Sequence, residues 1–182
     1  MSILLPVGHL LGSEYDEATG EATQRIRVGP DVVHLDGPRF AVWSLAHGTS
    51  TVDGVLASGL PDADVALAAL LDDGLVTVVA PDAVEAFARR HRLVPLMLGL
   101  GNLPESPEVY QIGLPGSPLL HVSAAVFDVF RWSPVENDLW SAGMATAGRL
   151  GSVGPEELLG ELLAVVHTLL ASSAVCLDAA LG

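Results

Sequence analysis

The sequence predicts an α+β chain built from two copies of one module, each with short strands followed by three helices. One observation is that VVHLDGPRFAVW at 32–43 resembles LLHVSAAVFDVF at 119–130, which lies 87 positions later. The other is that LLDDGLVTV at 70–78 resembles LLASSAVCL at 169–177. Because similar segments that keep their order indicate an internal repeat, we expect a duplicated module.

Five residues are identical across the first pair of segments and their flanks: Gln24 and Gln111, Gly29 and Gly116, His34 and His121, Phe40 and Phe127, Val42 and Val129. The spacing grows from 87 to 99 at the second pair, so the second copy carries 12 additional residues. We expect domains over residues 1–80 and 94–182. Residues 81–93 have acids early and arginines late, which is typical of a helix and predicts a linker helix.

The first module begins with two short strands, predicted over 23–28 and 32–36 around a turn at Gly29. Strand alternation places Val33 and Leu35 on one face and His34 on the other. Helical spacing of apolar residues predicts the first helix over 38–47.

Two more helices and a strand complete this module. The pattern Ser50-x-x-Asp53 resembles a capping box and predicts a helix over 51–58. A third helix begins near Pro61 and ends at Gly74, and LVTVV at 75–79 is a predicted strand. The acidic stretch at 12–21 is predicted to be a loop.

The second module has the same order of predicted elements. Strands are expected at 110–112 and 118–122, and the first helix at 124–132. Ser133-Pro134-x-Glu136 is typical of a helix start and predicts the second helix. The last helix, over 155–171, is apolar around most of its circumference, so we expect it to be buried.

Two strands, three helices and a closing strand are typical of a winged helix-turn-helix. Further features are Trp43 in the first helix, Gly48-Thr49, the helix start at Thr51-Val52, and Leu71-x-x-Gly74-Leu75. On these residues the first half, and more faintly the second, resembles the winged-helix family of the pyrroloquinoline-quinone biosynthesis chaperone. The relatives of that chaperone act as recognition elements for peptide precursors. The resemblance implies that an extended peptide binds beside a strand and a helix, without catalysis.

Charge argues against nucleic acid as a partner. The chain has eight arginines, no lysine and 22 acidic residues, for a net charge of −14, which repels a polyanion. The predicted third helices carry acids and no arginine, where a DNA reader would place basic or amide side chains. A winged-helix transcriptional regulator is an alternative, with Arg89, Arg90 and Arg92 as its candidate anion contact. The arginine-only basic residues are typical of a high-GC bacterial genome.

Composition and motifs narrow the remaining classes. The sequence lacks HExxH, clustered Cys and His, GxSxG and phosphate-loop patterns, so we expect no catalytic residue, metal or cofactor. An enzyme of unrecognised type is a second alternative. Because no apolar run is long enough for a membrane helix and no signal-peptide pattern is present, we expect a cytoplasmic protein without a membrane partner. A mean hydropathy of +0.48 favours self-association into a homo-oligomer.

The candidate partner-binding residues lie in the repeated strands. They are Val33, His34 and Leu35 in the first module and Leu120, His121 and Val122 in the second. A strand at the edge of a sheet accepts a partner strand through its unpaired backbone groups. The sequence therefore predicts a non-enzymatic adaptor or chaperone-like protein that binds a protein or peptide.

Overall fold

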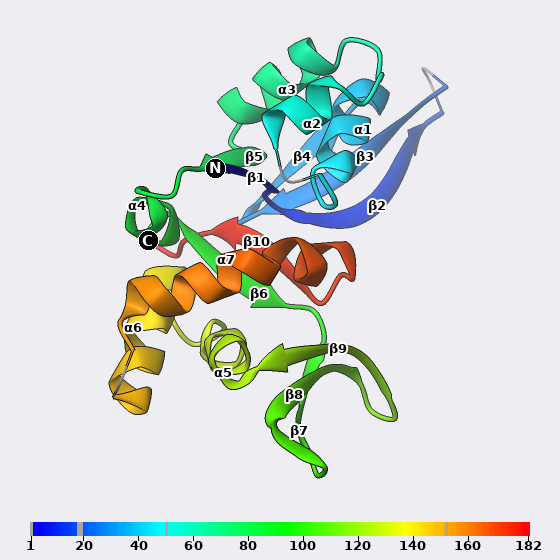
Figure 1. The fold of residues 1–182 in the computed structure, drawn as a ribbon. Helices are drawn as coiled ribbons and strands as arrows, with labels where there is room; N and C mark the ends of the chain where they lie inside the picture. The colour runs from blue at the N-terminus through cyan, green and yellow to red at the C-terminus, as the bar shows by residue number, and fades with distance from the viewer. Residues whose placement is uncertain (1, 18–19, 50, 152) are drawn as a thin grey trace. The chain divides into compact units, whose positions relative to one another are not determined.

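The chain has the predicted α+β class (Figure 1). The computed structural model describes residues 2–17, 20–49, 51–151 and 153–182. It divides into two compact units. The first comprises Met1–Pro81 with Leu177–Ala179, and the second comprises Asp82–Cys176 with Ala180–Gly182. Residues 177–179 therefore group with the first unit, although the predicted second module includes them.

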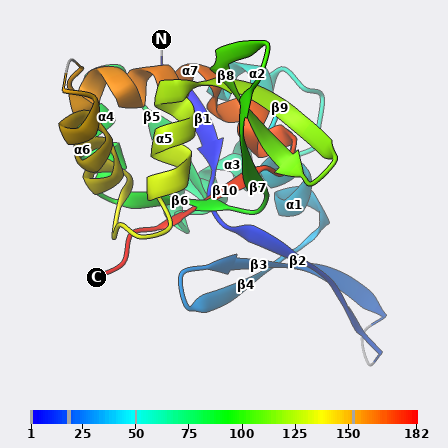
Figure 2. The ribbon, with the colours of Figure 1, turned by 90° about the horizontal axis from the view of Figure 1, so that it is seen from below.

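The first unit contains two small antiparallel sheets and three helices. Its elements are β1 (Ile3–Pro6), β2 (His9–Asp16), β3 (Glu21–Val28), β4 (Asp31–Leu35), α1 (Gly37–Leu45), α2 (Val52–Leu56), α3 (Ala63–Asp72) and β5 (Val76–Val79). Strands β2, β3 and β4 form one sheet in that order, seen as a long ribbon in Figure 2. Strand β1 pairs with β5 in the other sheet.

Local signals explain the helices of this unit. Asp36 caps α1, because its Oδ1 accepts the backbone N–H of Arg39 at 2.9 Å, and Pro38 lies in the first turn. Thr51 caps α2 by accepting the N–H of Gly54 at 3.0 Å. Ser50, where the sequence predicts the cap, lies outside the described residues. The core gathers α1 and α3 over one face of the sheet, with Leu35, Val42, Trp43 and Leu70 nearly or fully buried.

The predicted loop at 12–21 is wrong over most of its length. Strand β2 continues to Asp16 and pairs with β3, which begins at Glu21. This strand is difficult to predict from the sequence, because it lacks the alternation of apolar and polar residues that marks a strand with one buried face. Its acidic side chains, such as that of Glu14, are exposed. Gly12, with a φ of 111°, lies at a β-bulge between β2 and β3.

The second unit has a similar set of elements. They are α4 (Val84–Ala88), β6 (His91–Pro95), β7 (Leu98–Leu103), β8 (Ser106–Leu114), β9 (Ser117–Ser123), α5 (Ala124–Trp132), α6 (Leu139–Leu150), α7 (Pro155–Ala171) and the beginning of β10 (Val175–Ala179), whose last three residues group with the first unit. Strands β7, β8 and β9 form a three-stranded antiparallel sheet in that order. Strand β6 pairs with β10 in a two-stranded sheet.

Two predicted helix positions need correction. The predicted linker helix at 81–93 is helical only over Val84–Ala88, and its last residues belong to strand β6. The helix start predicted at Ser133 is wrong, because α6 begins at Leu139 with Asp138 as its cap. Ser133 instead ends α5: its buried hydroxyl donates to the carbonyl oxygen of Val129 at 2.6 Å.

After β1 in the first unit and after β6 in the second, the elements follow the same order: a three-stranded meander, three helices and a strand. The helices α1 and α5 each have nine residues and begin directly after the last strand of the meander. In both units the third helix and its C-cap are followed by a residue with positive φ, Gly74 at 69° after α3 and Ser173 at 54° after α7. Assignment of this arrangement to the winged-helix class stays a prediction.

The pairing of β8 with β9 corrects part of the sequence comparison. Ile26 faces Val33 across the first meander, and Ile112 faces Leu120 across the second, with both isoleucines fully buried. Residues in β3 and β8 therefore correspond 86 positions apart, whereas His34 and His121 remain 87 apart. The extra residue lies at an irregularity beside Gly113. The identities of Gln24 with Gln111 and of Gly29 with Gly116 are thus not structural equivalences.

Candidate functional site

A groove in the second unit lies between the last strand of the meander and the third helix. It has a cavity volume of about 700 Å³ and is formed by β8, β9, the start of α5 and α7, which Figure 1 labels. Strand β9 is at the end of its sheet, so one of its sides carries backbone groups without a neighbouring strand. Pro118 in β9 fits an edge position, because proline has no N–H to give to a neighbouring strand.

The groove lining is mainly apolar and includes two glutamates and one histidine but no arginine. From β8 and β9 come Glu108, Val109, Leu120, His121, Val122 and Ser123; from α5 comes Val126; from α7 come Glu161, Ala164, Val165, Thr168 and Leu169. Glu108 and Glu161 are exposed. An occupant therefore meets apolar surface and two carboxylates, which favour positive charge.

Two polar contacts organise the groove wall. The Nε2 atoms of Gln111 and His121 lie 3.1 Å apart, across the pairing of β8 with β9. The hydroxyl of Ser123 accepts the N–H of Val126 as the cap of α5 and lies 3.4 Å from Oε2 of Glu161. This longer contact links the end of β9 to α7, and most of the other lining residues are apolar.

All three residues predicted in the second module, Leu120, His121 and Val122, line the groove. Sequence reasoning did not include the opposite wall from α7. A partial signal was available: Glu161, Ala164 and Thr168 recur at helical spacing in a mainly apolar helix, and the structure leaves all three exposed. A small or polar stripe on such a helix indicates a face that the core does not cover.

The predicted residues of the first module are placed differently. Leu35 is fully buried in the core of its unit, so its side chain offers no exposed surface, and its part in partner binding stays a prediction. Val33 is half-buried and packs against the same core. His34 is exposed on the opposite face, with Nδ1 lying 3.3 Å from the Thr23 hydroxyl and 3.6 Å from a Glu14 carboxylate oxygen.

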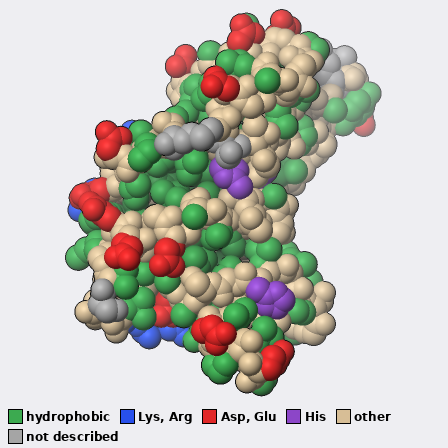
Figure 3. Space-filling model, in the orientation of Figure 1, with side chains coloured by type: hydrophobic (Ala, Val, Ile, Leu, Met, Phe, Trp, Pro, Cys, Tyr) green, Lys and Arg blue, Asp and Glu red, His purple; other side chains and the backbone are tan. Residues whose placement is uncertain are grey.

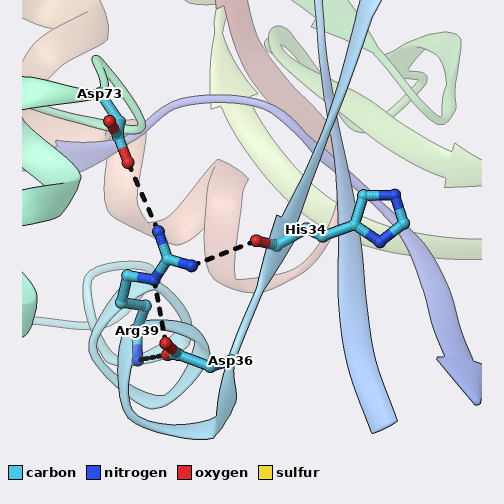
Figure 4. Close-up of polar contacts among 4 residues, drawn as sticks. All are labelled: His34, Asp36, Arg39 and Asp73. Carbon is cyan, nitrogen blue, oxygen red and sulfur yellow. Dashed lines mark hydrogen bonds and ion pairs between the residues drawn. The ribbon is translucent and has the colours of Figure 1, made fainter. Parts of the chain in front are cut away.

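Arg39 joins the last strand of the first meander to the third helix. Figure 4 shows its guanidinium between the carboxylate of Asp73 and the backbone carbonyl of His34, whose ring points away. Nη2 donates to the His34 carbonyl oxygen at 3.4 Å, and Nη1 lies 3.5 Å from Asp73. Nε lies 3.3 Å from the carboxylate of Asp36, the cap of α1. Arg39 thus links β4, α1 and the end of α3.

The three arginines expected as an anion contact follow α4. Arg89 pairs with Glu85 at 2.8 Å and lies over the ring of Trp140 at 5.1 Å. Nε of Arg90 donates to the carbonyl oxygen of Ala86 at 3.1 Å, and Arg92 is half-buried. Arg89 and Arg90 are therefore engaged within their own unit, and the anion contact stays a prediction.

Other chemistry is sparse in the part of the chain that the structure describes. It contains no group of three His, Cys, Asp or Glu residues arranged to hold a metal ion. Its helices include none that is long and apolar enough to cross a membrane. Cys176 is buried. On the face drawn in Figure 3, acidic side chains are scattered between apolar ones, and basic side chains are few.

Comparisons of the chain with protein families, with curated proteins and with solved structures gave no match. The function therefore has to be inferred from the groove itself.

Proposed function

We propose that this chain is a non-enzymatic peptide-binding protein, an adaptor or chaperone-like module whose second unit holds an extended segment in the groove between β9 and α7. The observation that carries the proposal is the position of an apolar groove of about 700 Å³ directly beside an edge strand. In this mode a peptide adds to the sheet as a further strand, so its backbone bonds to β9 and alternate side chains enter the groove.

The groove favours a particular peptide chemistry. Its lining includes Val109, Val122, Val126 and Leu169, which suit apolar side chains at every second peptide position. Glu108 and Glu161 favour lysine or arginine at the positions between or beside them. The four lining residues of β9 span about 13 Å at the usual rise per strand residue, room for about four peptide residues.

Catalysis and DNA binding have weaker support. The groove supplies apolar surface, strand backbone and carboxylates, which is the chemistry of recognition. A DNA-binding winged helix needs basic side chains on its third helix, whereas α7 carries Glu156, Glu157 and Glu161 and no arginine. Self-association stays a prediction, for which exposed apolar side chains such as Val65, Val135 and Met144 give a physical reason.

The test is a selection of random dodecamer peptides, displayed on phage, against the full chain. We expect the selected peptides to alternate apolar residues with lysine or arginine. Ala164→Arg places a long charged side chain in the groove at an exposed helix position, where arginine is a good helix former. It should weaken binding of the strongest selected peptide at least tenfold in titration calorimetry.

The matched control is Met144→Arg, which adds the same charge at an exposed position of α6 outside the groove lining. It should leave the affinity unchanged. Equal loss of binding in both variants, or failure to select any peptide that A164R rejects, would refute the proposed function.

A further inference from the structure

We infer that the first unit holds a second strand–helix groove of the same kind, and that the side chain of Arg39 fills it. The inference rests on the proposed function for its ligand class, an extended apolar peptide that carries positive charge. It makes the chain a binder of one peptide, with a second site that is latent.

Arg39 occupies a groove-lining position. Helices α1 and α5 begin after the caps Asp36 and Ser123, and in both the cap side chain accepts the N–H of the third residue that follows. That residue is Arg39 in the first unit and Val126 in the second. Because Val126 lines the groove of its unit, Arg39 lies at the corresponding place beside β4.

The two walls are also present in the first unit. Strand β4 is the last strand of its sheet, as β9 is. The ends of α3 and α7 correspond through matching bonds, Leu75 N–H to the Leu70 carbonyl at 2.8 Å and Ala174 N–H to the Leu169 carbonyl at 2.9 Å. At this spacing the α3 residues Val65, Ala66, Ala69 and Leu70 correspond to Ala164, Val165, Thr168 and Leu169 of the groove.

The side chain of Arg39 contacts both walls of this second groove, and we call it the plug. Its guanidinium donates to the carbonyl oxygen of His34 on the last strand and pairs with Asp73 at the end of α3 (Figure 4). A peptide that added to β4 would need edge carbonyls of this kind for its own N–H groups. In the second unit the corresponding side chains are those of Val126 and Ser172, which carry no charge and form no such bridge.

The plug is held by exposed ion pairs. The side chain of Arg39 is 30% exposed, and those of Asp36 and Asp73 are 58% and 48% exposed. Such pairs are screened by salt and contribute little individually. Without Arg39, the two aspartates would remain beside an apolar wall, which matches the acids and apolar floor of the second groove.

The experiment uses the full chain with the second groove blocked by Ala164→Arg. The dodecamer phage library is selected against A164R and against A164R/R39V, which carries the valine of the second unit in place of Arg39. We expect A164R/R39V to bind selected peptides with one-to-one stoichiometry and at least tenfold more tightly than A164R. The control A164R/R27V removes an arginine of β3 from the same unit and should gain nothing.

Failure of the two proposals can be distinguished. If the unaltered chain binds one peptide but A164R/R39V gains none, the latent groove is refuted and the proposed function stands. Two peptides bound with Arg39 intact also refute the plug. If A164R/R39V selects peptides while the unaltered chain selects none, the proposed function fails and the latent groove holds. Circular dichroism checks folding, and A164R/D73S, which carries the serine of Ser172, opens the bridge from the helix side as a second variant.

Discussion

The two units differ in the space between the last strand of the meander and the third helix. In the second unit, Val126 leaves the gap open beside β9. In the first unit, Arg39 crosses it to bond the His34 carbonyl and Asp73. The scaffold positions are alike, so the difference depends on two side chains. Two units with the same order of elements can therefore differ in whether they offer a binding surface.

The largest expected effect tests whether the two cores are equivalent. Ile26 and Ile112 are fully buried at corresponding places in their meanders. Ile26→Ala and Ile112→Ala should each cost about 2–5 kcal/mol of unfolding free energy, because each removes buried methyl groups and leaves a cavity. Urea unfolding followed by circular dichroism measures this cost.

Val32→Ala and Leu119→Ala are the controls for these core variants, since both side chains are nearly half exposed. They should change the unfolding free energy by less than about 0.5 kcal/mol. A negligible cost for I112A beside a large cost for I26A would break the correspondence of β3 with β8.

A smaller effect separates the helix caps of the two units. Asp36→Ala and Ser123→Ala each remove the cap of the first helix, at about 1 kcal/mol. D36A should cost more, by about 0.2–1 kcal/mol, because it also removes the ion pair with Arg39.

In a chain that carries Arg39→Val, the excess cost of D36A over S123A should vanish, because the partner of the Asp36 carboxylate is gone. The measurement is again urea unfolding of the single and double variants. Persistence of the full excess in the double variant would show that Asp36 acts through something other than Arg39.

The sequence predicts helix positions well where local signals are complete. Helices α5 and α7 begin and end as predicted, because Ser123 caps the first and Pro155 opens the second. The start of α6 was wrong because Ser133 carries the residue type of a cap but uses its hydroxyl to close the preceding helix. A local pattern does not reveal which of the two helices its hydroxyl serves.

The sequence predicted the groove wall from β9 but not the wall from α7. The repeat predicted Leu120, His121 and Val122, which line the groove, but alternation does not distinguish the buried Leu35 from its groove-lining counterpart Val122. The opposite wall from α7 and the bridge from Arg39 to Asp73 depend on tertiary placement. The irregularity beside Gly113 also hid the true strand register, since the glutamines at 24 and 111 match by identity and not by pairing.

The smallest expected effect is a pH dependence that comes from His91 in the second unit. Burial lowers the pKa of His91 in β6, and the charge of Arg90 also lowers it, whereas a hydrogen bond to the Phe87 carbonyl opposes them. The ring stacks on Phe87, and Nδ1 lies 2.9 Å from that carbonyl oxygen.

Because the folded pKa of His91 lies below the unfolded value, the unfolded chain binds more protons in the range where His titrates. Stability should therefore fall as the pH drops below about 6.5, the ordinary histidine pKa, and recover above it. His91→Phe keeps an aromatic ring against Phe87 and removes the titrating group, so it should flatten this part of the stability profile. His34→Phe, at an exposed strand position, is the control and should leave the slope in place. An unchanged slope in H91F would assign the acid sensitivity to another group.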